Sequence, residues 1–377
     1  MEISWDDIKI HRWGASSLGE VINIISAISD LENGTDLKEQ VDKTGRLWFR
    51  GCENVSYMLL PGLQRDKTEI FEGSTTPRYL ESNLREEMRL QHFQARVYHL
   101  LKTVPDNTIG WQELEQHYSN RTRYLDWSES AIVSLSFAVR PYLVQTSKSA
   151  QKDFLPCLWV LNPRSLNRKG YQYFSASENS RQLIIQALSE FPDMHFDATN
   201  FQGELSKNSD LFFSAKKVGS RADNDEMEGI PCLSVLHDLA SQTRHNLQNL
   251  LKQKEFNPYY YLLLRYYADG LPVFIDESQE EDFLPPLAVL QPYHSIRIKE
   301  QKGVFTIFPN YIARTKPIGD DVLTCTAMEN QRICSSCLYH IQLNDPERIA
   351  YDLLNIGVRG ADLYSEIDEY AREIEYR

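Results

Sequence analysis

Two short segments of the sequence carry side chains of the kinds that bind or transform anionic ligands. The first is Phe49-Arg50-Gly51, where an arginine and a glycine close a short aromatic stretch that begins at Leu47. A planar guanidinium binds phosphate or carboxylate through two hydrogen bonds, and a glycine lets a ligand approach the main chain. An arginine that merely forms an ion pair before a turn is the alternative interpretation of this segment.

The second segment, residues 116–127, is dense in polar groups and leads into a helical pattern. Its candidate site residues are Gln116, His117, Tyr118, Thr122, Arg123 and Asp126. We expect Asp126 and Glu129 to form a capping box at the start of a helix that ends at Pro141. The unpaired amides of a helix N-terminus attract anions. Two alternatives remain open here: Asp126 could be a helix cap alone, and His117 a core histidine.

Several other sites are excluded or disfavoured by the sequence. It contains no GxxxxGK[ST], GxGxxG, HExxH or GxSxG motif. The net charge of -13 argues against sequence-independent binding of nucleic acid, although a local basic groove remains possible. Six scattered cysteines indicate a reducing compartment. Cys334-x-x-Cys337 lacks a second pair, so we expect no metal site.

The elements that must position these side chains are short and irregularly spaced. We expect helices at residues 17–31, 80–102, 111–118, 346–354 and 361–375, and a helical stretch over 233–267. We expect strands at residues 47–51, 157–161, 287–290, 303–308 and 337–341. Residues 164–230 are polar and lack sustained periodicity. Because no ordered βαβ series is present, the pattern favours an α+β fold.

The expected organisation has three parts. An N-terminal helical segment occupies residues 1–40, a core domain occupies 41–163 and 284–377, and an insertion with a helical part occupies 164–283. The N-terminus has no signal-peptide pattern, and no window approaches 18 uninterrupted apolar residues. We therefore expect a cytoplasmic protein without a membrane partner.

The motifs resemble those of a known family, the FRG domain, which is named after the Phe-Arg-Gly signature found here at Phe49 to Gly51. The resemblance continues through Leu60 to Arg65, Gln116 to Trp127, Arg297 to Phe305 and a closing segment from Gly357 to Ile367. It covers roughly residues 42–370 and is interrupted by a long family-variable insertion around 164–280. The matched positions of the central motif, in order, are hard to obtain by chance. Asn120-Arg121 and Tyr124 depart mildly from the family pattern.

The resemblance implies a function. FRG-domain proteins are mainly bacterial and phage-associated, often linked to mobile elements and defence. The order of motifs is also distantly similar to the ADP-ribosyltransferase fold, which implies a mixed or antiparallel sheet core with flanking helices and NAD as substrate. Mapped onto this chain, the likeness implies catalytic roles for Arg50, Asp126 and Gln301. It also implies an NAD pocket, formed by Arg50, Gly51, His117, Tyr118, Thr122 and Arg123.

The first hypothesis is therefore an ADP-ribosyltransferase-like, NAD-consuming effector, a bacterial toxin or antiphage component, acting on an unknown acceptor. That acceptor would be a nucleic acid, a nucleotide or a protein, and an antitoxin or defence partner is possible. The local sequence Glu300-Gln301-Lys302 lacks a Glu-x-Glu pair, which disfavours transfer to arginine. One alternative is a non-catalytic nucleotide or nucleic-acid binding module. Another is a metal-free hydrolase using His117 and Asp126.

Overall fold

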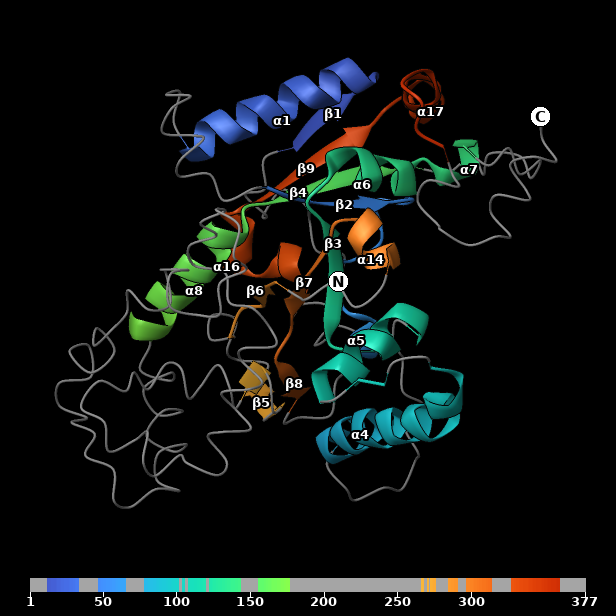
Figure 1. Ribbon diagram of the computed structural model, residues 1–377. Helices are drawn as coiled ribbons and strands as arrows, with labels where there is room; N and C mark the ends of the chain where they lie inside the picture. The colour runs from blue at the N-terminus through green and yellow to red at the C-terminus, as the bar shows by residue number, and fades with distance from the viewer. Residues whose placement is uncertain are drawn as a thin grey trace, which may run out of the picture.

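A computed structural model of the 377-residue chain is shown in Figure 1. It describes thirteen stretches of the chain, and all structural statements below concern these. They are residues 12–33, 47–65, 78–101, 104–105, 108–119, 122–143, 155–176, 266–267, 270, 272–275, 284–290, 296–313 and 327–359. Residues 233–265 of the helical stretch predicted over 233–267 lie outside the described residues, as do the predicted helix at 361–375, Cys232 and Cys325.

A seven-stranded, mostly antiparallel sheet forms the centre of the structure. Its order is β1-β9-β4-β2-β3-β7-β6, and within this sheet, among the described residues, the β1–β9 pair is parallel and the other pairs are antiparallel. The strands are β1 (Arg12–Ala15), β2 (Trp48–Cys52), β3 (Tyr124–Ser128), β4 (Cys157–Leu161), β6 (Leu287–Val289), β7 (Gly303–Ile307) and β9 (Leu338–Leu343). A separate parallel pair joins β5 (Pro272–Ile275) to β8 (Asn310–Ala313). The predicted α+β class is confirmed.

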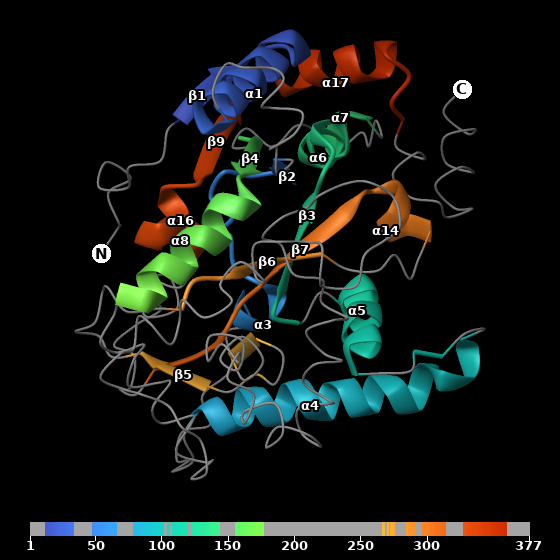
Figure 2. The same ribbon diagram turned by 60° about the vertical axis from the view of Figure 1, so that its left-hand side comes forward.

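Helices surround this sheet. They are α1 (Leu18–Asn33), α3 (Gly62–Arg65), α4 (Arg78–Val97), α5 (Thr108–Ser119), α6 (Ala131–Ala138), α7 (Arg140–Leu143), α8 (Pro163–Ala176), α14 (Ile296–Glu300), α16 (Arg332–Ser335) and α17 (Pro346–Asn355). Short 3-10 turns occupy Tyr98–Leu100 and Met328–Asn330. In Figures 1 and 2, α4 and α5 lie at the opposite end of the sheet from α1 and α17.

The main core lies between the sheet and three helices, α1, α6 and α17. Alternate residues of the strands face it, because successive side chains of a strand point to opposite faces. The buried strand residues are Phe49, Leu158, Val160, Tyr339, Ile341 and Leu343, and the helices add Val21, Ile28, Leu135, Ala138, Ile349 and Leu353. Helices α8 and α16 lie on the other side of the sheet in Figure 1. This core fixes β2 and α6, which carry the site.

Most of the predicted helices and strands are confirmed within two or three residues of their predicted ends. The capping box at Asp126 is wrong. Asp126 lies within β3, opposite Phe305 of β7, and the side chain of Ser130 caps α6 by accepting a hydrogen bond from the amide of Val133. The side chains able to cap a helix here are those of Asp126, Ser128 and Ser130. Pairing with β7 extends β3 past Asp126, so that the helix begins later than predicted.

Two further expectations are corrected. Pro141 does not end the helical region: α6 ends at Ala138, and Pro141 lies in the first turn of α7, where its missing N–H would have no helical partner in any case. Helix α8 occupies part of the polar stretch that showed no sustained periodicity. It packs against β6, and Asn167 exchanges hydrogen bonds with the main chain of Ala288 at 2.8 and 3.0 Å. In the described part of the chain, no helix has the length and apolar character needed to cross a bilayer.

Candidate functional site

Strand β2 brings the Phe-Arg-Gly motif against helix α6. A Cβ atom on Gly51 would stand 1.8 Å from the carbonyl oxygen of Ser134, so any other residue would push the helix away. The Ser134 hydroxyl donates to the carbonyl of Phe49 at 2.9 Å and ties the helix to the strand. A glycine is therefore required at position 51, because a larger residue would keep α6 from packing this closely on β2. The sequence alone did not reveal this requirement.

Arg50 lies where β2 and β3 begin to separate. The recorded pairing of these two strands is a single position, Phe49 opposite Ser128. Beyond it, Nη1 of Arg50 donates to the main-chain carbonyl of Asp126 at 2.6 Å and stands 3.9 Å from the Asp126 carboxylate. The guanidinium thus links the diverging strands, and one-fifth of its side chain stays exposed. An arginine fixed in this way presents its remaining donors in a defined direction.

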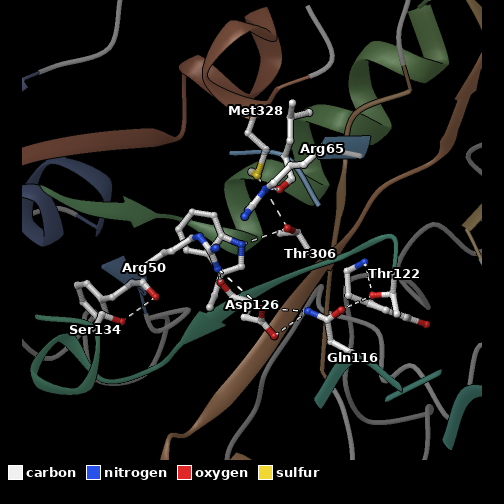
Figure 3. Close-up of polar contacts among 12 residues, drawn as sticks. Arg50, Arg65, Gln116, Thr122, Asp126, Ser134, Thr306 and Met328 are labelled. Carbon is white, nitrogen blue, oxygen red and sulfur yellow. Dashed lines mark hydrogen bonds and ion pairs between the residues drawn. The ribbon is translucent and has the colours of Figure 1, made fainter. Parts of the chain in front are cut away.

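A chain of hydrogen bonds orients the carboxylate of Asp126 (Figure 3). Thr122 Oγ1 donates to Oε1 of Gln116, and Nε2 of Gln116 donates to both carboxylate oxygens of Asp126 at 3.0 and 3.1 Å. The amide of Tyr124 in turn donates to Thr122 Oγ1 at 3.2 Å. Because an ionised carboxylate only accepts hydrogen bonds, the NH₂ end of the Gln116 amide faces Asp126, and the Thr122 hydroxyl donates to the carbonyl end. Helix α5 and strand β3 are joined at this point.

Gln301 lies in the turn between α14 and β7, two residues before the strand begins at Gly303. Its main chain is held twice: the Ser128 hydroxyl donates to its carbonyl at 2.6 Å, and its amide donates to the carbonyl of Arg297 at 2.9 Å. The next residue, Lys302, has a φ of 48°, which is uncommon for a residue other than glycine. The turn therefore has a defined position beside the end of β3.

These elements enclose a cavity of about 360 Å³, within the roughly 300–1,000 Å³ typical of small-ligand sites. Arg50, Gly51, Asp126 and Gln301 all line it. In the described part of the chain, its charged lining residues are Arg50, Arg65, Arg140 and Arg297 against Glu53 and Asp126. Aromatic rings also line it, from Phe49, Tyr57, Trp127, Phe137 and Phe305. The four arginines outnumber the two carboxylates, so the cavity favours an anion that carries an apolar or planar part.

Other predicted site residues lie elsewhere. The side chain of Arg123 is 3% exposed and forms an ion pair with Glu86 at 3.1 Å, with further hydrogen bonds to the carbonyls of Tyr266 and Phe308. Thr122 is fully buried behind Gln116. Tyr118 is 67% exposed and is not among the residues that line the cavity. His117 lies on α5, and its side chain is outside the described part of the structure.

Several cavity residues were missed by the sequence prediction. Arg65 ends α3 and donates to the carbonyl of Leu60 at 2.7 Å. Burial lowers the pKa of Arg65, and the nearby Arg50 lowers it further. Arg140 and Arg297 begin or flank other helices, where a solvated arginine is the default interpretation. The resemblance did include Leu60 to Arg65 and Arg297, which was a usable signal for two of them.

Two buried acids near the site keep their protons to unusually high pH. Glu329 accepts hydrogen bonds from the amide of Leu59 at 3.1 Å, and burial raises its pKa to about 7. Glu115, on the same helix as Gln116, also has a pKa raised to about 7 by burial, partly offset by Arg89. Among the described residues, no group of three or more His, Cys, Asp or Glu side chains could hold a metal ion.

The cavity's main-chain framework comes from β2, β3 and α6, and this is the region that a family model recognises. Residues 45–147 match the FRG domain. The match contains the Phe-Arg-Gly motif and the whole of residues 116–127. The later segments that resemble the FRG domain, after residue 147, lie outside it. No curated protein and no solved structure matches this chain.

Proposed function

We propose that this FRG-domain chain is an ADP-ribosyltransferase-like effector that consumes NAD, as a bacterial toxin or antiphage defence component. One observation supports this more than any other: Arg50, Asp126 and Gln301, which the motif order assigns to catalysis, line a single cavity with an arginine excess. NAD carries a pyrophosphate between two planar bases. Guanidinium groups and aromatic rings are the protein groups that bind these parts.

Arg50 and Arg65 form the proposed pyrophosphate clamp. Both line the cavity, both are held by main-chain carbonyls, and they are close enough for Arg50 to lower the pKa of Arg65. Two cations held near each other repel, and a doubly charged pyrophosphate relieves that repulsion. Because each guanidinium is already fixed, little side-chain entropy is lost on binding.

The proposed reaction breaks the bond between C1′ of the ribose and the nicotinamide nitrogen. The bonding electrons move to the positively charged ring, which leaves as neutral nicotinamide, and the ribose becomes oxocarbenium-like. A nucleophile on the acceptor, or water, then bonds to C1′ and releases its proton. The carboxylate of Asp126, oriented by Gln116, would stabilise the positive charge. The Gln301 side chain would bind the ribose by hydrogen bonds, since an amide carries no charge.

The test is incubation of the purified full-length chain with NAD labelled in the nicotinamide and in the adenylate, with nucleotide, RNA and protein acceptors. Arg50→Ala and Arg65→Ala should each weaken NAD binding by about 2 kcal/mol or more, roughly 30-fold. Asp126→Asn should abolish nicotinamide release while NAD still binds. Arg348→Ala is the matched control, because Arg348 is an exposed arginine on α17, paired with Asp352.

The alternative function, a non-catalytic nucleotide or nucleic-acid binding module, is favoured by one observation. The cavity has an amide at Gln301, and among the described residues the carboxylates that line it are those of Asp126 and Glu53. Retention of nucleotide or RNA by the wild type, without nicotinamide release under any acceptor condition, would support this alternative. Failure of the wild type to bind NAD would contradict the first proposal.

A further inference from the structure

Two cysteines lie directly opposite each other beside the arginine clamp. Cys52, the last residue of β2, is paired in register with Cys157, the first residue of β4. Both are free and buried, and Cys52 also lines the cavity while Cys157 does not. Cys52 is therefore the member of the pair that borders the cavity.

The register satisfies the geometric requirement for a disulfide. Residues directly opposite in an antiparallel pair have Cα atoms roughly 4.5 or 5.5 Å apart, and a disulfide needs roughly 4.4–6.8 Å. The two thiols also lie close enough to shift each other's pKa. A bond between them would therefore need side-chain rotation, without separation of the strands.

We propose that Cys52 is an oxidation site for hydroperoxides that enter the cavity, and that Cys157 resolves it to a disulfide. The Cys52 thiolate attacks one peroxide oxygen, the O–O bond breaks, and the leaving hydroxide or alkoxide takes a proton. The Cys157 sulfur then attacks the Cys52 sulfur, the S–O bond breaks, and hydroxide leaves with the Cys157 proton as water. The two thiols lose two electrons in total. Hydrogen peroxide is reduced to two molecules of water, and an organic hydroperoxide to one water and one alcohol.

Local charges assign the two roles. The hydrogen bond from Cys157 lowers the pKa of Cys52 to about 7; burial opposes this, and Arg50 and Arg65 assist it. The pKa of Cys157 is raised well above its usual value by the hydrogen bond with Cys52 and by burial. The nearby Glu329 raises the pKa of Cys157 further, and the charge of Cys52 raises the pKa of Glu329 in turn. Cys52 is thus the thiolate that reacts first near neutral pH.

The chain provides an internal control in Cys334 and Cys337. These thiols are also buried, and they too stand close together, with Cys337 Sγ donating to the carbonyl of Cys334 at 3.3 Å. Neither lines the cavity, and burial raises the pKa of Cys334 well above its usual value. A general susceptibility of buried thiols to oxidation would affect both pairs alike.

The experiment is peptide mapping of the wild-type full-length chain after treatment with hydrogen peroxide at pH 7, followed by alkylation. We expect a Cys52–Cys157 linkage at a dose that leaves Cys334 and Cys337 alkylated, and oxidation of Cys52 at least about five times faster than of Cys334. In Cys157→Ser, a dimedone adduct should accumulate at Cys52. In Cys52→Ser, Cys157 should remain reduced.

Three results would overturn the proposal: equal oxidation of the two pairs, linkage of Cys52 to another cysteine, or a sulfenic acid at Cys52 that persists in the wild type. The wild-type mapping does not depend on how well the variants fold. It also needs no NAD, so its failure would leave the proposed function intact, and the absence of NAD turnover would not affect its outcome.

Discussion

Thr122 acts on the cavity without lining it. Its hydroxyl donates to the carbonyl end of the Gln116 amide and holds it in place, and the amide in turn holds the Asp126 carboxylate. In Thr122→Val the amide loses this constraint and a buried acceptor loses its donor. We expect nicotinamide release to fall about tenfold with little change in NAD affinity, and stability to fall by roughly 1–3 kcal/mol.

Thr122→Ser separates positioning from packing, because it keeps the hydroxyl and loses only the methyl group. We expect turnover in Thr122→Ser to be close to that of the wild type. Equal loss of turnover in both variants would show that the hydroxyl does not position Asp126. Turnover and calorimetric NAD binding, measured on the same preparations, provide the comparison.

Glu329 makes stability depend on pH. Because burial raises its pKa from 4.5 to about 7, the folded state binds this proton more tightly than the unfolded chain. The resulting stabilisation is complete below pH 4.5 and is lost as the pH rises through 7. The stability of the wild type relative to Glu329→Gln should fall by roughly 2–3 kcal/mol between pH 4.5 and 7.5, as measured by urea unfolding. A difference that is constant with pH would contradict this assignment.

The contact between β2 and α6 leaves no room at Gly51. We expect Gly51→Ala to destabilise the fold by about 3 kcal/mol or more, because the added methyl meets main-chain atoms of α6 that cannot rotate away. Gly19, in the first turn of α1, is the matched control, since a Cβ there meets nothing within 4 Å. Gly19→Ala should be neutral or stabilising by up to about 1 kcal/mol. Thermal unfolding of both variants provides the measurement.

The sequence predicts the elements well where the pattern is local. Cys157 to Leu161 is an uninterrupted apolar run, and it forms a strand buried at all five positions. Asp126 was misassigned because its strand depends on pairing with Phe305, which is distant in sequence. Arg123 was misassigned for the same reason, because it is buried in an ion pair with Glu86, which is distant in sequence. Side-chain type indicates what a residue can do, and only long-range packing decides whether it faces the cavity or the core.

Charge is distributed unevenly over the protein. The chain as a whole carries a net charge of -13, yet the cavity has four arginines and two carboxylates. A small anion that enters the cavity is attracted by the near guanidinium groups, while a long polyanion also meets the acidic remainder of the surface. The local arginine excess is therefore better suited to a dinucleotide than to an extended nucleic acid.

The order of the sheet strands has a practical consequence for anyone who excises the matched segment. Residues 45–147 contain β2 and β3, which are central strands of the sheet. The longest pairing of β2 is with β4 and that of β3 is with β7, and both partner strands lie after residue 147. A fragment cut at these limits would bare two hydrogen-bonding edges and much of the apolar surface beneath α6. We expect it to aggregate on expression, whereas a chain that extends beyond Asn355 would stay dispersed in light scattering.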